Sequence, residues 1–198
     1  MSSAPLYNPE QTVDWHLPAK GRVGMSALIV GETALFTIFV VAYVFYLGKS
    51  LAGPKPSEVL QVPILGTICL LSSSLTIWRA ERAIEDDRMA SFTAWLGATL
   101  ALASAFLMNT ALEWRKLIYH DGLTISTNLF GTTFYSLVGL HATHVVVGLF
   151  LLTSVFLLSL TGWVDSRQSQ RFGVVARYWH FVDAVWIVVF SVVYLIGR

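Results

Sequence analysis

The sequence predicts an all-α integral membrane protein, a polytopic bundle of five transmembrane helices. Of its 198 residues 55% are hydrophobic and only 13% are charged, whereas ordinary soluble domains carry about 25% charged residues. Five apolar stretches account for this bias, and each is near or above the roughly 17 to 25 residues that cross a hydrocarbon core of about 30 Å. They cover residues 23–47, 62–78, 92–112, 129–160 and 178–197.

The first two stretches differ in length. The first places Glu32 ten residues after Arg22, about 15 Å along a helix and therefore close to the bilayer centre. The second is short and has Pro63 at its start, where the missing N–H would have no helical partner in any case. We therefore expect a short second helix with this proline in its first turn.

The third and fourth stretches carry small residues four positions apart. Gly97, Ala101 and Ala105 recur along the third, and Gly139 with Thr143 repeats the pattern in the fourth. Small residues at this spacing let helices approach closely in lipid, so the helices should form a compact bundle. The fourth stretch would run about 48 Å as a helix, and it must tilt or project from the bilayer.

The first 21 residues lack the basic-then-apolar pattern of a cleaved signal peptide. We expect a retained cytoplasmic tail over 1–21 and one membrane domain over 22–198. With the N-terminus inside, eight basic residues lie on the cytoplasmic side and five on the outer side. Positive charge favours the inner side, so the sequence predicts an N-terminus in the cytoplasm and a C-terminus outside.

Charge and cysteine content exclude other classes of protein. The net charge of +1 gives no indication of a nucleic-acid partner, and we expect none. Acidic and basic residues alternate over 79–88, a pattern we interpret as a solvated turn. The single cysteine, Cys69, lies inside the second stretch, which excludes a disulfide within the chain.

Six ionisable side chains lie within the apolar stretches or at their ends, where contact with lipid is costly and indicates a role. They are Glu32, Glu113, His141, His144, His180 and Asp183. We expect them to be structural or lipid-associated sites, with no catalytic residue, cofactor-binding residue or metal ligand among them. Glu113 ends the third stretch beside Arg115 and Lys116, and it fits an ordinary solvated carboxylate equally well.

We predict that Glu32 faces His141 or His144 across a helix interface. The two histidines lie roughly 18 and 22 Å from the outer end of their stretch, so their depths overlap with that of the carboxyl. A hydrogen bond between imidazole and carboxyl would satisfy two otherwise costly groups at once. His180 and Asp183, three residues apart, share one face of the last helix near its cytoplasmic end.

Three interpretations compete for these side chains. A membrane cytochrome b holds haem between histidines on facing helices, yet His141 and His144 lie on one face of one helix. A free-standing proton transporter would use such groups as a pathway, but no internal repeat or pair of broken helices is evident. In the third, the groups are buried structural pairs in a subunit whose chemistry belongs to a partner.

Five sequence blocks, in this order, resemble subunit III of the haem-copper terminal oxidases, of which cytochrome c oxidase is the main representative. The similarity runs from about Gly24 to Gly197 and matches the five-helix bacterial form. The blocks are GETALF at 31–36, VP at 62–63 with LSSSLT at 71–76, EW at 113–114, FGTTFYSLVGLHATHV at 130–145 and YWHFVDAVW at 178–186.

The resemblance implies an accessory subunit of a complex in the bacterial cytoplasmic membrane that reduces dioxygen to water and translocates protons in aerobic respiration. The chain would bind subunit I directly, lie in one complex with subunit II and hold phospholipids. Glu32 matches the family's carbodiimide-reactive carboxyl, which fits a carboxyl kept protonated by desolvation. The resemblance does not decide whether the complex is part of a respiratory supercomplex.

The same resemblance places the haems and copper in partner subunits. The catalytic core of such an oxidase needs six histidine ligands, and a binuclear copper site needs two cysteine thiolates, whereas this chain has five histidines and one cysteine. The chain itself is therefore expected to be non-catalytic. The electron donor, cytochrome c or quinol, is bound by other subunits, so a quinol oxidase or the related nitric oxide reductase remains an alternative.

Overall fold

The computed structural model describes residues 20–50 and 53–197, and every regular element within these ranges is helical. The predicted tail over 1–21 lies outside the described residues except for Lys20 and Gly21, which begin the first helix. The elements, in order, are α1 (Lys20–Tyr46), α2 (Pro56–Val59), α3 (Ile64–Glu85), α4 (Met89–Tyr119), α5 (Leu129–Leu160), η1 (Ser166–Gln168), α6 (Ser169–Phe190) and the π-helical η2 (Ser191–Ile196).

The prediction of an all-α polytopic membrane bundle is confirmed. Each of its five long helices, α1, α3, α4, α5 and α6 continued by η2, contains all or nearly all of one apolar stretch. Helices α3 and α4 extend beyond the ends of their stretches, and α6 begins nine residues before its stretch. Within the described ranges four of them are apolar enough over 18 residues to cross a membrane. The exception is α3, because three consecutive serines and the charges from Arg79 onward dilute its apolar side chains.

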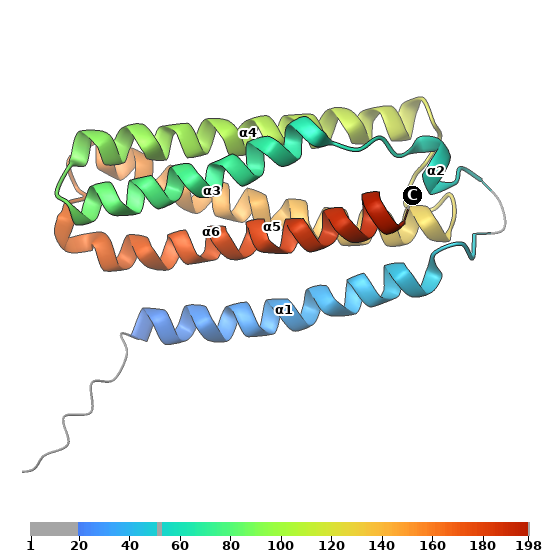
Figure 1. The fold of residues 1–198 in the computed structure, drawn as a ribbon, viewed down its shortest axis with the longest axis horizontal. Helices are drawn as coiled ribbons and strands as arrows, with labels where there is room; N and C mark the ends of the chain where they lie inside the picture. Colours follow the sequence, from blue (N-terminus) through green and yellow to red (C-terminus); the bar gives the residue numbers. More distant parts are fainter. Residues whose placement is uncertain (1–19, 51–52, 198) are drawn as a thin grey trace, which may run out of the picture.

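The helices lie nearly parallel in a bundle, with α1 at its edge (Figure 1). Four helices form a ring in which α3 packs against α4 and α6, and α5 packs against α4 and α6. Helix α1 packs against α5 and α6, on the outer side of this ring. Only Phe36 and Tyr43 of α1 are buried, so α1 turns most of its apolar surface outward.

Short turns connect α3 to α4 and α5 to α6. At the end of α3, Asp87 adopts a left-handed conformation with φ of 58°, which Asp tolerates better than most residues. At the end of α5, Gly162 has φ of 72°, and the Trp163 amide donates to the Leu158 carbonyl at 3.0 Å. Both turns satisfy carbonyl groups that the helix end leaves open.

The interpretation of residues 79–88 as a solvated turn is wrong for residues 79–85. These residues are the last turns of α3, which ends at Glu85. The helix continues because Ala80, Ala83 and Ile84 are fully buried in the bundle. Only the three residues that follow form the turn. Burial of a narrow apolar stripe therefore outweighs the mixed charge of the segment.

The core of the ring depends on close approach between α5 and α6. A Cβ atom at Gly148 of α5 would lie 2.8 Å from two ring carbons of Trp179 in α6. The Trp179 side chain is fully buried, and its indole Nε1–H donates to Ser73 Oγ of α3 at 2.9 Å. The missing side chain of Gly148 therefore makes room for an indole that joins three helices.

We predict that Gly148→Ala destabilises the protein by about 1–3 kcal/mol, because the added methyl group forces the buried indole away from its position. The free energy of unfolding of the full chain in mixed micelles measures this effect. Gly24→Ala is the matched control, because nothing lies within 4 Å of a Cβ at Gly24. That change should be neutral or slightly stabilising in a helix. Equal effects of the two substitutions would contradict the packing argument.

Candidate functional site

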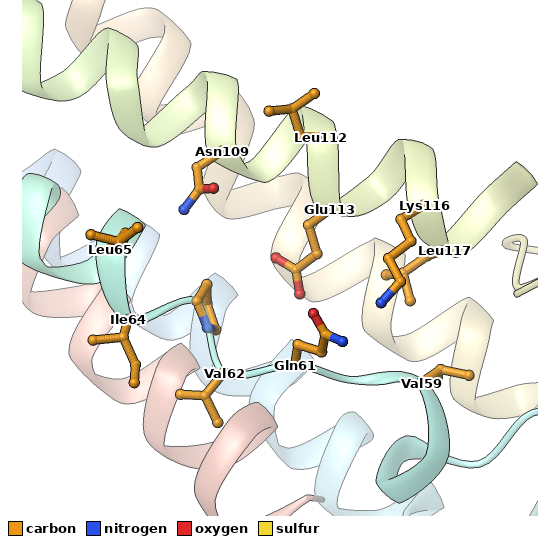
Figure 2. A pocket seen from close by; sticks show the side chains of 11 residues that line it. Val59, Gln61, Val62, Ile64, Leu65, Asn109, Leu112, Glu113, Lys116 and Leu117 are labelled. Atoms are coloured by element: carbon orange, nitrogen blue, oxygen red, sulfur yellow. The ribbon is translucent and has the colours of Figure 1, made fainter. Parts of the chain in front are cut away.

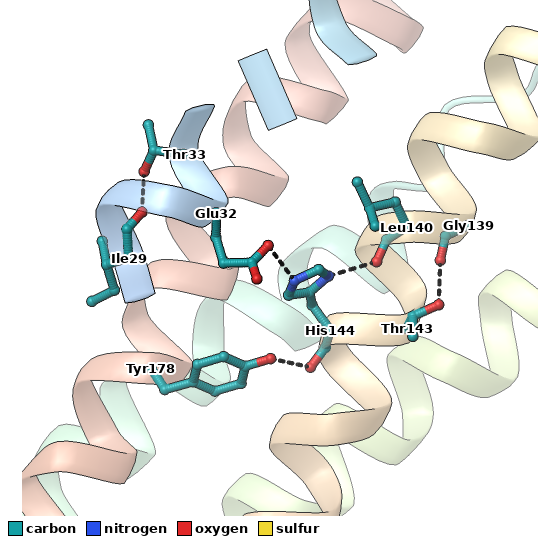
Figure 3. Close-up of polar contacts among 8 residues, drawn as sticks. All are labelled: Ile29, Glu32, Thr33, Gly139, Leu140, Thr143, His144 and Tyr178. Carbon is teal, nitrogen blue, oxygen red and sulfur yellow. Dashed lines mark hydrogen bonds and ion pairs between the residues drawn. The ribbon is translucent and has the colours of Figure 1, made fainter. Parts of the chain in front are cut away.

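Helices α1 and α5 are joined by an ionisable pair near the middle of the bundle. Glu32 Oε2 of α1 lies 3.0 Å from His144 Nε2 of α5 (Figure 3). The side chains are 28% and 14% exposed, respectively. Glu32 is the thirteenth residue of the 27 in α1, so the pair lies at mid-depth of the helix. Of the two histidines named as candidate partners, His144 is therefore the one that contacts the carboxyl.

The second nitrogen of His144 determines how protons are shared in this pair. His144 Nδ1 lies 2.8 Å from the carbonyl oxygen of Leu140, which can only accept, so Nδ1 carries a proton. Nε2 of a neutral ring then accepts from a protonated Glu32 carboxyl, whereas Nε2 of a charged ring donates to a carboxylate. In both states the pair has no net charge, which a site of low dielectric constant favours.

A third helix closes the same junction. The hydroxyl of Tyr178 in α6 donates to the backbone carbonyl of His144 at 3.2 Å (Figure 3). Phe36 of α1 packs against the His144 ring with centroids 4.9 Å apart. Thus α1, α5 and α6 meet around one imidazole, and the junction that we name the Glu32–His144 pair holds α1 to the ring.

His180 and Asp183 of α6 both contact Ser74 of α3. The Ser74 hydroxyl donates to Asp183 Oδ2, and His180 Nδ1 lies 3.2 Å from Ser74 Oγ. Asp183 is only 2% exposed. The two side chains thus share a helix face, and the partner of both is a serine of α3. The Trp179–Ser73 bond lies one residue earlier on each helix.

Glu113 of α4 is half-buried and accepts a hydrogen bond from the Tyr194 hydroxyl of η2 at 3.0 Å. It points into a pocket of about 430 Å³ between α4 and the segment that precedes α3, where Gln61 and Lys116 approach it (Figure 2). The description of Glu113 as an ordinary solvated carboxylate therefore does not fit the structure. This pair ties α4 to η2.

His141 differs from the other ionisable groups. Its ring is 1% exposed, and neither nitrogen has a hydrogen-bond partner among the described residues. It stacks on Trp186 of α6, with ring centroids 4.9 Å apart and planes inclined by 30°. A charged imidazole would be unpaired here, so the surroundings favour a neutral ring that packs as an aromatic side chain.

The functional partners that sequence reasoning missed are mostly hydroxyl groups: Ser73, Ser74, Tyr178 and Tyr194, together with the Trp179 indole. A signal existed, because three serines in a row are unusual inside an apolar stretch, and uncharged polar side chains bond across helices in membranes. Among residues 20–50 and 53–197 no three His, Cys, Asp or Glu side chains are grouped so that they could hold a metal ion. The hydrogen bonds of these hydroxyl and indole groups join helices of the bundle.

Comparison with known proteins gives the family. A family model described as Cytochrome c oxidase subunit III matches residues 16–198. Cytochrome c oxidase subunit 3 of Synechocystis is 38% identical over 96% of this chain and 82% of its own length. That of Bacillus sp. strain PS3 is 32% identical over 88% of this chain and 85% of its own length. Cytochrome bo(3) ubiquinol oxidase subunit 3 of Pseudomonas aeruginosa is 30% identical over 88% and 84%.

These matches cover nearly all of the described bundle, including every helix that contributes to the Glu32–His144, Ser74–Asp183 and Glu113–Tyr194 contacts. The relatives are subunits of oxidases of the haem-copper type, whose haems and copper belong to other subunits of the complex. The chain belongs to the cytochrome c oxidase subunit III family.

Proposed function

We propose that this chain is an accessory, non-catalytic subunit of a haem-copper oxidase that binds the metal-bearing subunit I and keeps the complex intact during turnover. The observation that carries this proposal is the use of its intramembrane polar groups. Glu32, Glu113, His144, His180 and Asp183 each bond to a side chain on a different helix. These side chains therefore serve to hold the helices of the bundle together.

The complex to which the chain belongs reduces dioxygen to water and translocates protons. The chain contacts subunit I directly, and subunit II lies in the same complex. Large apolar side chains cover the outer surface of the helices, for example Val30, Ile38 and Phe45 of α1. A surface of this kind is stable only against lipid or another membrane subunit. This supports direct helix-to-helix contact with subunit I.

Phospholipid binding is supported by a groove of about 690 Å³ at the N-terminal end of α1. Its lining combines the apolar side chains of Val23, Ala27 and Val30 with Arg22 of α1 and Arg177 of α6. Two guanidinium groups above an apolar wall suit a phosphate group and an acyl chain. We propose that this groove, which we name the α1–α6 groove, holds a phospholipid of the leaflet on this side.

The basic residues at this end of the bundle also indicate how the chain is oriented in the membrane. The ends of the helices that carry Lys20, Arg22 and Arg177 lie on one side of the bundle together with the α3–α4 turn (Figure 1). The excess of basic residues on this side supports an N-terminus in the cytoplasm of a bacterial cell, with the chain in the cytoplasmic membrane.

A quinol oxidase is the second candidate for the complex. The similarity to a subunit of a ubiquinol oxidase from Pseudomonas aeruginosa, at 30% identity, favours it. Co-purified subunits decide between the two: a copper-containing subunit II or a bound c-type cytochrome supports a cytochrome c oxidase, and their absence supports the quinol form. A free-standing transporter is a remote alternative, and it would move protons in liposomes without other subunits.

The Ser74→Ala variant tests the accessory role. We expect the initial rate of dioxygen reduction by the purified complex to stay within about twofold, while the lifetime of activity falls. Loss of the serine leaves the buried Asp183 carboxyl without its partner, at a cost of about 1–3 kcal/mol. Ser72→Ala is the matched control, since it removes a neighbouring hydroxyl with no such bond. An immediate loss of dioxygen reduction in the Ser74 variant would contradict an accessory role.

A double-mutant cycle of Glu32→Ala and His144→Ala should give a coupling energy of about 0.5–2 kcal/mol, the range for hydrogen bonds between membrane helices. Unfolding of the full chain in mixed micelles supplies the four free energies. The cycle of Glu32→Ala with His141→Ala is the control, because His141 has no polar contact with the carboxyl. Its coupling should be near zero, and similar couplings in both cycles would contradict the pairing.

The double substitution Arg22→Gln and Arg177→Gln should lower the phospholipid that co-purifies with the complex. Each arginine at a membrane surface is worth about 1 kcal/mol with an anionic headgroup, so the affinity should fall roughly fivefold for each one removed. Phosphorus analysis of the detergent-purified complex measures the change. Arg115→Gln, at the other end of the bundle, should leave the lipid content unchanged. An unchanged content in the double variant would remove the groove as a lipid site.

A further inference from the structure

A third pocket lies where α3 ends and α4 begins, at the same end of the bundle as the α1–α6 groove (Figure 1). Its volume is about 310 Å³, and its lining includes Trp78, Arg79, Arg82, Arg88, Ser91 and Trp95. Neither α1 nor α6 contributes to it, so it is separate from the α1–α6 groove. We name it the arginine pocket. It holds three guanidinium groups and two indoles in a small space.

Two of these arginines are held by aromatic rings. The guanidinium carbon of Arg79 lies 5.0 Å from the ring centroid of Trp95 in α4. That of Arg82 lies 4.5 Å from the ring centroid of Trp78, one turn earlier on α3. Stacking uses the face of a guanidinium and leaves the N–H groups at its edge available for hydrogen bonds. The indoles therefore orient both arginines for a planar or tetrahedral oxyanion.

The carboxylates of this segment do not pair with Arg79 or Arg82. Among the described residues neither Arg79 nor Arg82 has a carboxylate within ion-pair distance, whereas Asp86 is 2.7 Å from Arg88. None of the side chains that line the pocket is acidic. Glu81 points to α6 instead, because its Oε1 would lie 3.0 Å from a Cβ atom at Gly173. Arg79 and Arg82 of the arginine pocket therefore have no paired carboxylate among the described residues, whereas Arg88 is paired with Asp86.

The position of the pocket identifies the kind of anion. Trp78 is the last residue of the apolar stretch 62–78, and this residue is 43% exposed. Exposed indoles at the end of a membrane span lie at the level of the headgroups. Basic pockets between membrane helices at this level suit anionic lipid headgroups. An apolar floor formed by the indoles then adjoins the first carbons of the acyl chains.

We propose that the arginine pocket binds the phosphate headgroup of an anionic phospholipid through the guanidinium groups of Arg79 and Arg82. The site rests on the α3–α4 turn alone, and it depends neither on the α1–α6 groove nor on the accessory role. An oriented lipid here would fasten the α3–α4 turn to the surface of the bilayer. Two of the charged residues in 79–88, Arg79 and Arg82, would then bind a ligand and would not contact only solvent.

Titration of the detergent-solubilised complex with phosphatidylglycerol, followed by native mass spectrometry, tests the site. We expect the double variant Arg79→Gln and Arg82→Gln to bind one adduct roughly 25-fold more weakly, about fivefold for each arginine. Arg115→Gln should bind as the unchanged protein does. Equal binding by the double variant and the unchanged protein would overturn the proposal, as would an equal loss in Arg115→Gln.

Ser91→Asp keeps the test decisive if loss of both arginines prevents assembly. It places a carboxylate in the lining while both arginine–indole stacks remain, so phosphatidylglycerol binding should fall by a similar factor. Phosphatidylcholine should bind more weakly than phosphatidylglycerol, and 10 mM inorganic phosphate should not displace the lipid. Equal binding of the two lipids would overturn the preference for an anionic headgroup, and displacement by inorganic phosphate would assign the site to a free anion. The double variant Arg22→Gln and Arg177→Gln should keep this adduct, which separates its outcome from that of the α1–α6 groove.

Discussion

A polar side chain at membrane depth is costly without a partner inside the protein, because hydrocarbon offers none. In this bundle three ionisable groups meet that constraint by bonding to a side chain of another helix. Glu32 ties α1 to α5, Asp183 ties α6 to α3 and Glu113 ties α4 to η2. Together the three contacts reach every long helix. These contacts add polar links between helices to the apolar packing of the ring.

The helices are not held equally firmly. In the ring, a fully buried indole packs against Gly148 and bonds Ser73, and aromatic side chains fill the space around His141. Helix α1 buries only Phe36 and Tyr43 and has one ionisable contact, near its midpoint. Above and below that contact it relies on apolar packing alone. The groove lined by Arg22 and Arg177 lies on this less firmly held side, between α1 and α6.

Much of the fold could be predicted because lipid imposes a simple code. An apolar run of sufficient length is a helix across the bilayer, and each of the five runs lies almost entirely within one long helix. The same code failed at 79–85, where charged residues alternate with Ala80, Ala83 and Ile84 on a buried stripe. Composition counts every side chain equally, whereas helix packing depends only on those that face a neighbour.

Depth and residue type nominated the site residues, but they could not decide their contacts. His141 and His144 are three residues apart on one helix and only about 4.5 Å different in depth, so both were acceptable partners for Glu32. The rotation of α5 about its axis decided between them: it turns one imidazole toward α1 and packs the other against Trp186. The hydroxyl partners Ser74 and Tyr194 could not be predicted from depth and residue type, because an uncharged group has little effect on hydropathy.

The sequence by itself determined the class of protein, the order of its five long helices and the ionisable groups that needed partners, because these follow from the cost of placing each residue type in lipid. The tertiary structure alone decided which partner each group has, and it alone brought Arg79 of α3 onto the indole of Trp95 in α4. These contacts depend on the rotation and spacing of helices, which arise from the packing of side chains far apart in the chain.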